Sequence, residues 1–199
     1  SGVKVLPEHG LGFAHRRLSI LDLDPRSDQP WTSSDGRFVI VYNGEVYNFK
    51  ELRGELAAHG TRFRTEGDTE VVVEGVRRWG VPGFLSRAAG MFAFALYDVQ
   101  ARRLTLARDR AGKKPLYYAD TPEGLVFASE LRALWRLAPG LKELDPKGLE
   151  AWLRLKFCPS PLTLVKGVKK VPPAHFLEAK ADGSHSLARY WSPLGHARP

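Results

Sequence analysis

The sequence predicts an α+β fold with a large share of antiparallel sheet. Short apolar segments of strand length recur along the whole chain, whereas only three segments carry the apolar spacing that a helix requires. No internal repeat or low-complexity tract interrupts them. With 199 residues, of which 43% are hydrophobic, the chain can bury a sizeable core as a single domain.

Strands are predicted wherever β-branched and aromatic residues cluster between turn residues. In chain order, the segments that look extended are residues 10–17, 37–42, 91–97, 103–107, 115–119, 125–128 and 175–179. Strands that outnumber the helices in this way indicate an α+β protein rather than an alternating α/β one.

Helices are predicted from their start signals. Asn48 followed by Glu51 fits a capping box for a helix that runs to about residue 58. A second helix suits residues 69–79, where valines recur at helical spacing and Asp68 stands in the N-cap position.

The third helix opens at Asp145-Pro146, with proline at its first position, and runs to about Lys156. Beyond residue 191 the chain is expected to become a linker. Residues 1–191 then form one domain, and residues 192–199 lead away from it.

The composition argues against several classes of function. The formal net charge is +8, but lysine and arginine are scattered and lack interleaved aromatic residues, so no nucleic-acid partner is expected. No apolar run is long enough to span a membrane and no signal-peptide pattern occurs, so we expect a cytoplasmic protein with no membrane partner. The six histidines show no metal-ligand spacing, so no metal site is expected.

Cys158 is the only cysteine, so no disulfide can form within the chain. Apolar residues and prolines surround it in the sequence and supply no base to form a thiolate. We interpret it as a buried or loop thiol rather than a nucleophile.

The strongest functional signal lies between residues 38 and 48, where an apolar strand leads into Asn43, Gly44 and Glu45. Asn-Gly between apolar runs is also a strong hairpin signal, because both residues tolerate a positive φ. From this segment alone, a hairpin turn is the preferred interpretation and a substrate site is the alternative.

Other segments accompany it in a fixed order. They are residues 14–20 (AHRRLSI), 65–70 (TEGDTE), 90–98 (GMFAFALYD), 107–118 (ARDRAGKKPLYY) and 127–131 (FASEL). The whole set resembles the class II glutamine amidotransferases, and within them the N-terminal glutaminase domain of asparagine synthetases. The closing segments, residues 167–175 and 189–191, are similar to the asparagine synthetase branch.

The resemblance implies the four-layer αββα sandwich of N-terminal-nucleophile hydrolases. Members of that family begin with a cysteine whose thiol is the nucleophile and whose α-amino group is its base, whereas this chain begins with Ser1 and Gly2. We therefore expect a sandwich that lacks its first strand and helix, and a chain that is inactive as given. The linker at residues 192–199 would lead toward a C-terminal synthetase domain.

The implied chemistry is hydrolysis of the side-chain amide of glutamine. Arg17 would clamp the substrate α-carboxylate, because a planar guanidinium binds both oxygens at once. Asn43 and Gly44 would form the oxyanion hole through a side-chain and a backbone N–H. Glu45 and Asp68 would contact the α-ammonium group. Further lining of the pocket is expected from Leu18, Ser19, Ile20 and Leu21.

Two of these residues keep an alternative from sequence alone: Arg17 as an exposed strand arginine, and Asp68 as a helix cap. The resemblance also implies that the ammonia serves ATP-dependent amidation of aspartate in the synthetase domain in cis. No cofactor is expected in the present domain, and ATP and Mg²⁺ would belong to the synthetase domain. The expected partners are glutamine, that domain and, as a further option, a second copy in a homodimer. The alternative function is a non-catalytic binding or structural module.

Overall fold

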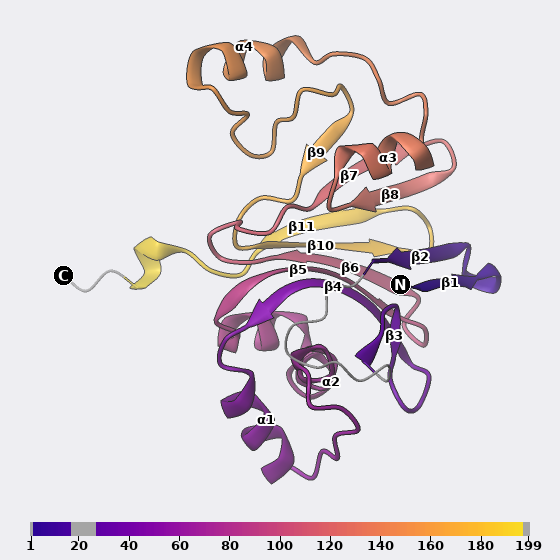
Figure 1. Ribbon diagram of the computed structural model, residues 1–199, viewed down its shortest axis with the longest axis vertical. Coiled ribbons are helices and arrows are strands. Elements are labelled where there is room, and N and C mark those ends of the chain that lie inside the picture. The colour runs from indigo at the N-terminus through magenta and orange to yellow at the C-terminus, as the bar shows by residue number, and fades with distance from the viewer. Residues whose placement is uncertain (1, 17–26, 197–199) are drawn as a thin grey trace.

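The structure, a computed structural model, describes residues 2–16 and 27–196 (Figure 1). Its strands are β1 (Gly2–Leu6), β2 (Leu11–His15), β3 (Trp31–Thr32), β4 (Phe38–Val46), β5 (Gly90–Asp98), β6 (Arg103–Arg108), β7 (Tyr117–Thr121), β8 (Gly124–Ala128), β9 (Val168–Lys170), β10 (His175–Lys180) and β11 (His185–Arg189). Its helices are α1 (Phe49–Ala58), α2 (Asp68–Arg87), α3 (Leu131–Leu137) and α4 (Pro146–Leu155), with short 3-10 turns η1 (Pro7–His9) and η3 (Pro193–His196).

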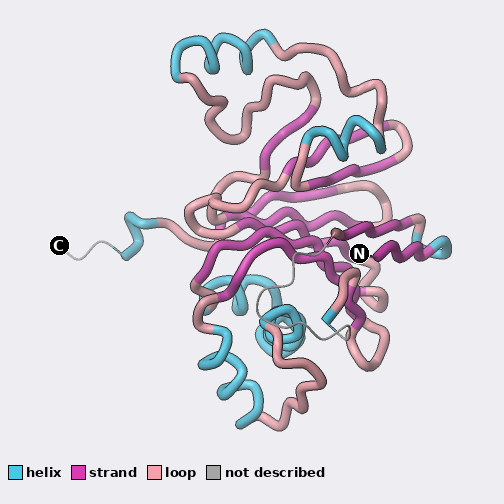
Figure 2. Tube along the Cα trace, viewed as in Figure 1, coloured by secondary structure: helices cyan, strands magenta, loops and turns pink. Residues whose placement is uncertain are grey.

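These elements form four layers, which confirms the predicted α+β sandwich. Helices α1 and α2 cover one face of a six-stranded sheet of order β11-β10-β6-β5-β4-β3 (Figure 1). A second layer of strands, made of β1-β2 and of β8-β7-β9, faces the other side of that sheet, and α3 and α4 lie beyond it. The tube in Figure 2 shows the helices gathered outside the strands on both sides.

The core is divided by the six-stranded sheet, and β4 shows how. Along β4, Phe38, Ile40 and Tyr42 pack among the side chains under α1 and α2, whereas Val39 packs with Phe13 between the two strand layers. This is the two-residue alternation of a strand that is buried on both faces. A smaller cluster lies under α3.

The hairpin preferred at Asn43 and Gly44 is wrong, because both residues lie inside β4 and pair with Ala93 and Phe92 of β5. Gly44 has φ 144°, and a Cβ atom there would lie 2.1 Å from the carbonyl oxygen of Met91. Glycine is therefore required by the close approach of β5 and not by a turn.

The capping box at Asn48 is also wrong, although the helix that it predicted is present as α1. The Asn48 side chain donates to the carbonyl oxygen of Arg87 (3.1 Å) and accepts from the backbone N–H of Ala89 (2.9 Å). Both of its polar groups are thus used to join the start of α1 to the end of α2.

Helix α2 is longer than predicted and begins differently. Its N-cap is Gly67, so Asp68 is its first residue and not its cap. The helical path is broken at Gly80, whose φ of 69° and ψ of 171° are non-helical, and resumes around Pro82. The apolar periodicity that ended the predicted helix at Trp79 stops at this kink.

The third predicted helix is confirmed as α4. The Asp145 side chain accepts hydrogen bonds from the backbone N–H groups of Lys147 and Gly148, and Pro146 occupies the first turn. In the tail that was predicted as a linker, the described residues form η3, where Leu194 is 85% exposed.

Several elements were not predicted. Strands β3 and β9 contain two and three residues, too few for any periodicity to register, and β11 is almost entirely exposed. Strand β1, which pairs with β2, and helix α3 were also missed. Among the described residues, no helix combines the length and apolar character needed to cross a membrane.

Truncation of Phe84 is expected to cost about 3–5 kcal/mol of unfolding free energy, because its ring is fully buried between α2 and the sheet. Phe157 is 58% exposed, so Phe157→Ala is the matched control and should change stability by less than about 0.5 kcal/mol. Urea unfolding of the 199-residue chain measures both. Equal losses for the two variants would contradict the assigned core.

Candidate functional site

The central feature of the candidate site is one edge of β4. Beyond Ile40, which pairs with Trp31, this edge has no strand partner among the residues that the structure describes. Side chains take two of its backbone donors: Tyr42 N–H donates to Gln29 Oε1 (2.6 Å), and Val46 N–H donates to Asp68 Oδ2 (2.9 Å).

Gly44 lies midway between these two donors, and its N–H points to the same edge because backbone N–H groups alternate along a strand. The pairing of β4 with β5 is consistent with this direction of the Gly44 N–H. Phe92, which lies opposite Gly44, directs both of its backbone groups away, to Asp109. Among the described residues, the Gly44 N–H has no acceptor and is directed at this edge.

Asp109 holds the backbone of Phe92 on the side of β5 that faces away from β4. Its carboxylate is fully buried, and it accepts from the backbone N–H groups of Phe92 (3.2 Å), Ala111 (3.0 Å), Lys113 (2.9 Å) and Lys114 (2.9 Å). Its own N–H donates to the carbonyl oxygen of Phe92 (2.8 Å). In the sequence this stretch contributes to the family resemblance, but no role at the site was predicted for it. An aspartate directly before a turn that contains glycine was the signal available for Asp109.

A cleft of about 660 Å³ lies on the face of β4 that carries Asn43. Its floor is apolar and includes Val41, Ala93 and Ala95. Consecutive residues line both of its sides, residues 10–15 at β2 and residues 123–129 at β8. Since only every second side chain of a strand faces one way, consecutive lining means that the two strands present their edges to the cleft.

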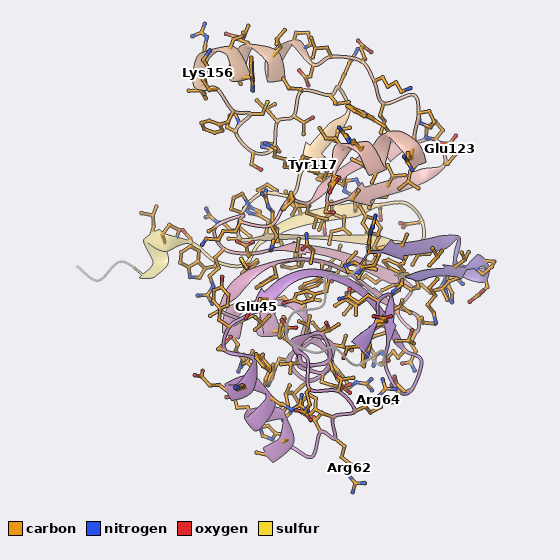
Figure 3. The ribbon with its side chains drawn as sticks, viewed as in Figure 1. Glu45, Arg62, Arg64, Tyr117, Glu123 and Lys156 are labelled. Carbon is orange, nitrogen blue, oxygen red and sulfur yellow. The ribbon has the colours of Figure 1, made fainter. Side chains whose placement is uncertain are left out.

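The two acidic residues approach the site from opposite faces of β4. Alternation places Glu45 on the same face as Asn43, and Figure 3 shows it at the end of the sheet near α1. Asp68 lies on the helix side, where it is only 6% exposed. Its Oδ2 atom accepts from the Tyr42 hydroxyl (2.5 Å) as well as from Val46.

Burial raises the pKa of Asp68 above its usual value, and hydrogen bonds from Tyr42, Val46 and the first turn of α2 oppose this rise. Burial likewise raises the pKa of the Tyr42 hydroxyl, and the neighbouring Asp68 carboxylate raises it further. A cation placed beside Asp68 would favour its ionised form.

The remaining residues predicted for the site lie outside the described residues. They are Arg17, Leu18, Ser19, Ile20 and Leu21. The described residues on either side of this segment do lie at the site, because His15 lines the cleft and Gln29 binds the edge of β4.

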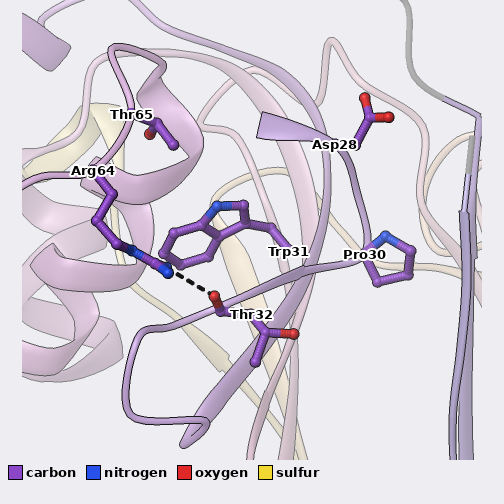
Figure 4. A pocket seen from close by; sticks show the side chains of 6 residues that line it. All are labelled: Asp28, Pro30, Trp31, Thr32, Arg64 and Thr65. Atoms are coloured by element: carbon purple, nitrogen blue, oxygen red, sulfur yellow. Dashed lines mark hydrogen bonds between the residues drawn. The ribbon is translucent and has the colours of Figure 1, made fainter. Parts of the chain in front are cut away.

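A second, smaller pocket contains none of the predicted site residues (Figure 4). It measures about 330 Å³ and lies between β3 and the loop before α2. Arg64 spans it, with Nη2 donating to the carbonyl oxygen of Thr32 (3.0 Å) and the guanidinium 4.9 Å from the centre of the Trp31 ring. These contacts hold β3 against the loop, and we assign this pocket no substrate.

The structure places Cys158 in the loop after α4, half-buried, with Sγ 3.4 Å from the carbonyl oxygen of Gly148. This confirms the interpretation as a loop thiol. Within the described parts of the chain, no group of three or more His, Cys, Asp or Glu side chains could hold a metal ion.

Comparison with known proteins decides the family. A model of the family described as "Glutamine amidotransferase domain" matches residues 2–191. This chain is a class II glutamine amidotransferase domain.

The domain is similar to asparagine synthetases of bacteria. It is 39% identical over 184 residues to "Asparagine synthetase [glutamine-hydrolyzing] 1" of Bacillus subtilis. The matched region covers 92% of this chain and 28% of that relative. A fungal relative, "Amidase chry2" of Gibberella zeae, is 34% identical over 92% of this chain and 26% of its own length. The domain thus spans less than a third of the curated relatives that it matches.

Among solved structures, the fold is similar to that of the glutamine phosphoribosylpyrophosphate amidotransferase of B. subtilis. The TM-score is 0.65 and the sequence identity 21%, over 89% of this chain and 34% of that one. At this identity the likeness concerns the fold, and it confirms the sandwich of the N-terminal-nucleophile hydrolase type.

Replacing Asp68 by asparagine is expected to change how stability depends on pH. A raised pKa means that the folded state holds the proton more tightly than the unfolded state, so wild-type stability falls as pH rises above 3.8, the usual aspartate value, toward the raised value. The stability of Asp68→Asn relative to wild type should therefore increase across that window and level off above it. Urea unfolding at a series of pH values measures the difference.

Asp182→Asn is the control with the opposite sign. Hydrogen bonds from Ser184 lower the pKa of the exposed Asp182, so the stability of Asp182→Asn relative to wild type should decrease as pH rises toward 3.8 and level off above it, below the window of Asp68. A pH-independent difference for Asp68→Asn would show that burial does not perturb this carboxyl.

Proposed function

We propose that this domain hydrolyses glutamine to glutamate and ammonia within a protein like the asparagine synthetases, and that the ammonia is consumed by a synthetase unit of the same protein. The observation that carries the proposal is the Gly44 N–H, directed at a strand edge that no described strand pairs, beside Asn43 and the cleft. The similarity to glutamine-hydrolysing asparagine synthetases supports the choice of glutamine.

In the proposed reaction, a thiolate adds to the side-chain amide carbon and the carbonyl oxygen becomes an oxyanion. The Gly44 N–H and the Asn43 side-chain amide would donate to that oxygen. A donor of this kind contributes about 3 kcal/mol of transition-state stabilisation. Ammonia then leaves with a proton, and water cleaves the thioester to give glutamate and regenerate the thiol.

The nucleophile would come from outside the described residues. Cys158 is the only cysteine of the chain, and its sulfur contacts α4. We place a cysteine-bearing strand in the cleft, paired with the facing edges of β2 and β8, because it would then run toward Asn43 over an apolar floor. The free α-amino group of that cysteine would serve as the base.

Recognition of the α-amino and α-carboxyl groups would fall to the remaining residues. Arg17 would bind the carboxylate in bidentate fashion. Glu45 from the cleft face and Asp68 from the helix side would share the ammonium group, and the attraction would keep Asp68 ionised despite its burial. The pocket would be completed by Leu18, Ser19, Ile20 and Leu21.

The synthetase unit would supply the second half of the reaction. ATP and Mg²⁺ would be bound there to activate a carboxylate for amidation, and aspartate is the acceptor that we propose. No residue of the present domain is assigned to either group.

Asn43→Ala is expected to lower the kcat of glutamine hydrolysis by about 100- to 1000-fold, since it removes a donor that acts on the transition state. KM for glutamine should change little. The assay is ammonia release by the full-length gene product that carries this domain. Gln100→Ala, at an exposed position after β5, is the control and should match wild type.

Two outcomes would contradict the proposal. Unchanged kcat in Asn43→Ala would remove Asn43 from the oxyanion hole. A folded full-length wild type that binds glutamine without releasing ammonia would favour the non-catalytic binding module instead.

A further inference from the structure

Helix α4 leaves most of its apolar side chains in solvent. Trp152, Leu153 and Leu155 are 41%, 56% and 51% exposed, and Phe157, just after the helix, is 58% exposed. We call these four residues the α4 patch. A domain that functions alone rarely exposes apolar side chains gathered in this way, and such a patch marks an interaction site.

The patch continues a face of α4 that is already packed at its start. Gly148 is the one buried residue of the helix, and a Cβ atom there would lie 1.8 Å from the carbonyl oxygen of Thr163. Helical spacing places Trp152 and Leu155 in line with Gly148. The same face is therefore covered in its first turn and uncovered afterwards.

The opposite face of α4 is polar and satisfied, since Glu150 and Arg154 form an ion pair of 3.0 Å. Lys156 extends over the ring of Trp152, 5.7 Å from its centre, and adds a positive charge at the edge of the patch. Figures 1 and 3 show α4 at the outer end of the molecule, with Lys156 at its tip. A partner can reach this surface without displacing any other element.

The patch is also connected to the candidate site by a series of contacts. The loop after α4 is tied to β9 by Lys170, whose N–H donates to Pro161 and whose Nζ donates to Cys158. Arg108 donates to the carbonyl oxygen of the next residue, Val171 (2.8 Å), and is followed by Asp109. A partner seated on α4 would thus lie at one end of a series of contacts that leads to Asp109.

We propose that the α4 patch docks the synthetase unit of the same protein, through an apolar surface edged with acidic residues. The domain spans 28% of the B. subtilis synthetase that it matches, so a relative of this kind carries a large further unit on the same chain. Covalent attachment presents that unit at high effective concentration. We expect acidic residues at the edge of the partner's surface because Lys156 and the net charge of +8 make this domain positive. The identity of the unit rests on the proposed function, whereas the existence of the interface does not.

The test is side-chain footprinting of the full-length gene product with hydroxyl radicals, read by mass spectrometry. All four residues of the α4 patch should label about tenfold more slowly than their exposure in this domain implies, because the core of an interface excludes water. Leu187 and Leu194, which are 43% and 85% exposed, are the reference positions that should label freely.

The double variant Trp152→Glu/Leu155→Glu should restore labelling of Leu153 and Phe157, and Leu187→Glu should not. Low labelling of Leu134, the fully buried residue of α3, reports that each variant remains folded. If the patch of the wild-type protein labels as readily as Leu187, the docking proposal is overturned.

Other occupants give distinct results, and each overturns the proposal. Protection that grows with protein concentration, together with a dimer in light scattering, would assign the patch to a second copy. Protection that requires anionic phospholipid vesicles would assign it to a membrane surface. Footprinting needs no glutamine, so protection without ammonia release would contradict the proposed function alone, whereas ammonia release without protection would contradict the docking alone.

Discussion

The rest of the site depends on the backbone N–H groups from which the buried carboxylate of Asp109 accepts hydrogen bonds. By taking both backbone groups of Phe92, directly and through its own N–H, Asp109 makes the Gly44–Phe92 pair the kind that exchanges no hydrogen bonds. Gly44 must then direct its N–H outward. Three further backbone donors, in the turn that follows β6, bind the same carboxylate. The direction of the Gly44 N–H is therefore determined by buried groups and does not depend on a surface loop.

Close packing of backbone on backbone is the second constraint, and it limits what residue 44 can be. The carbonyl oxygen of Met91 occupies the space where a side chain would begin. Residue 90 shows the reverse contact, since a Cβ atom on Gly90 would lie 2.2 Å from the carbonyl oxygen of Glu45. Two glycines on facing strands thus allow β4 and β5 to converge at the site. On the helix side of β4, Tyr42 and Asp68 form a hydrogen-bonded pair.

The spacing of apolar residues predicted the α+β class and most of its elements, as in Val72 and Val76 of α2 or the alternation along β4, whereas the four layers were predicted from the family resemblance. Local polar signals were less reliable. Asn43-Gly44 and Asn48-Glu51 both have the composition of turns and caps, but their partners come from β5 and from the end of α2, which no local pattern contains. The family was recognisable because several short motifs occur in order. The role of Asp109 depends on a partner in another strand, and only the fold reveals it.

Beyond Ile40, β4 has an edge that no described strand pairs, and this has a consequence for selectivity. Exposed sheet edges ordinarily recruit further strands, which is a route to aggregation. Here Gln29 and Asp68 block the donors on either side of Gly44, about 7 Å away along the strand. An incoming peptide would need several donors in a row and finds one. In the proposed reaction this edge would therefore offer one donor to a single carbonyl oxygen and not a row of donors to a β-strand, so the hydrogen bonds that hold the fold together would also limit which ligand can bind.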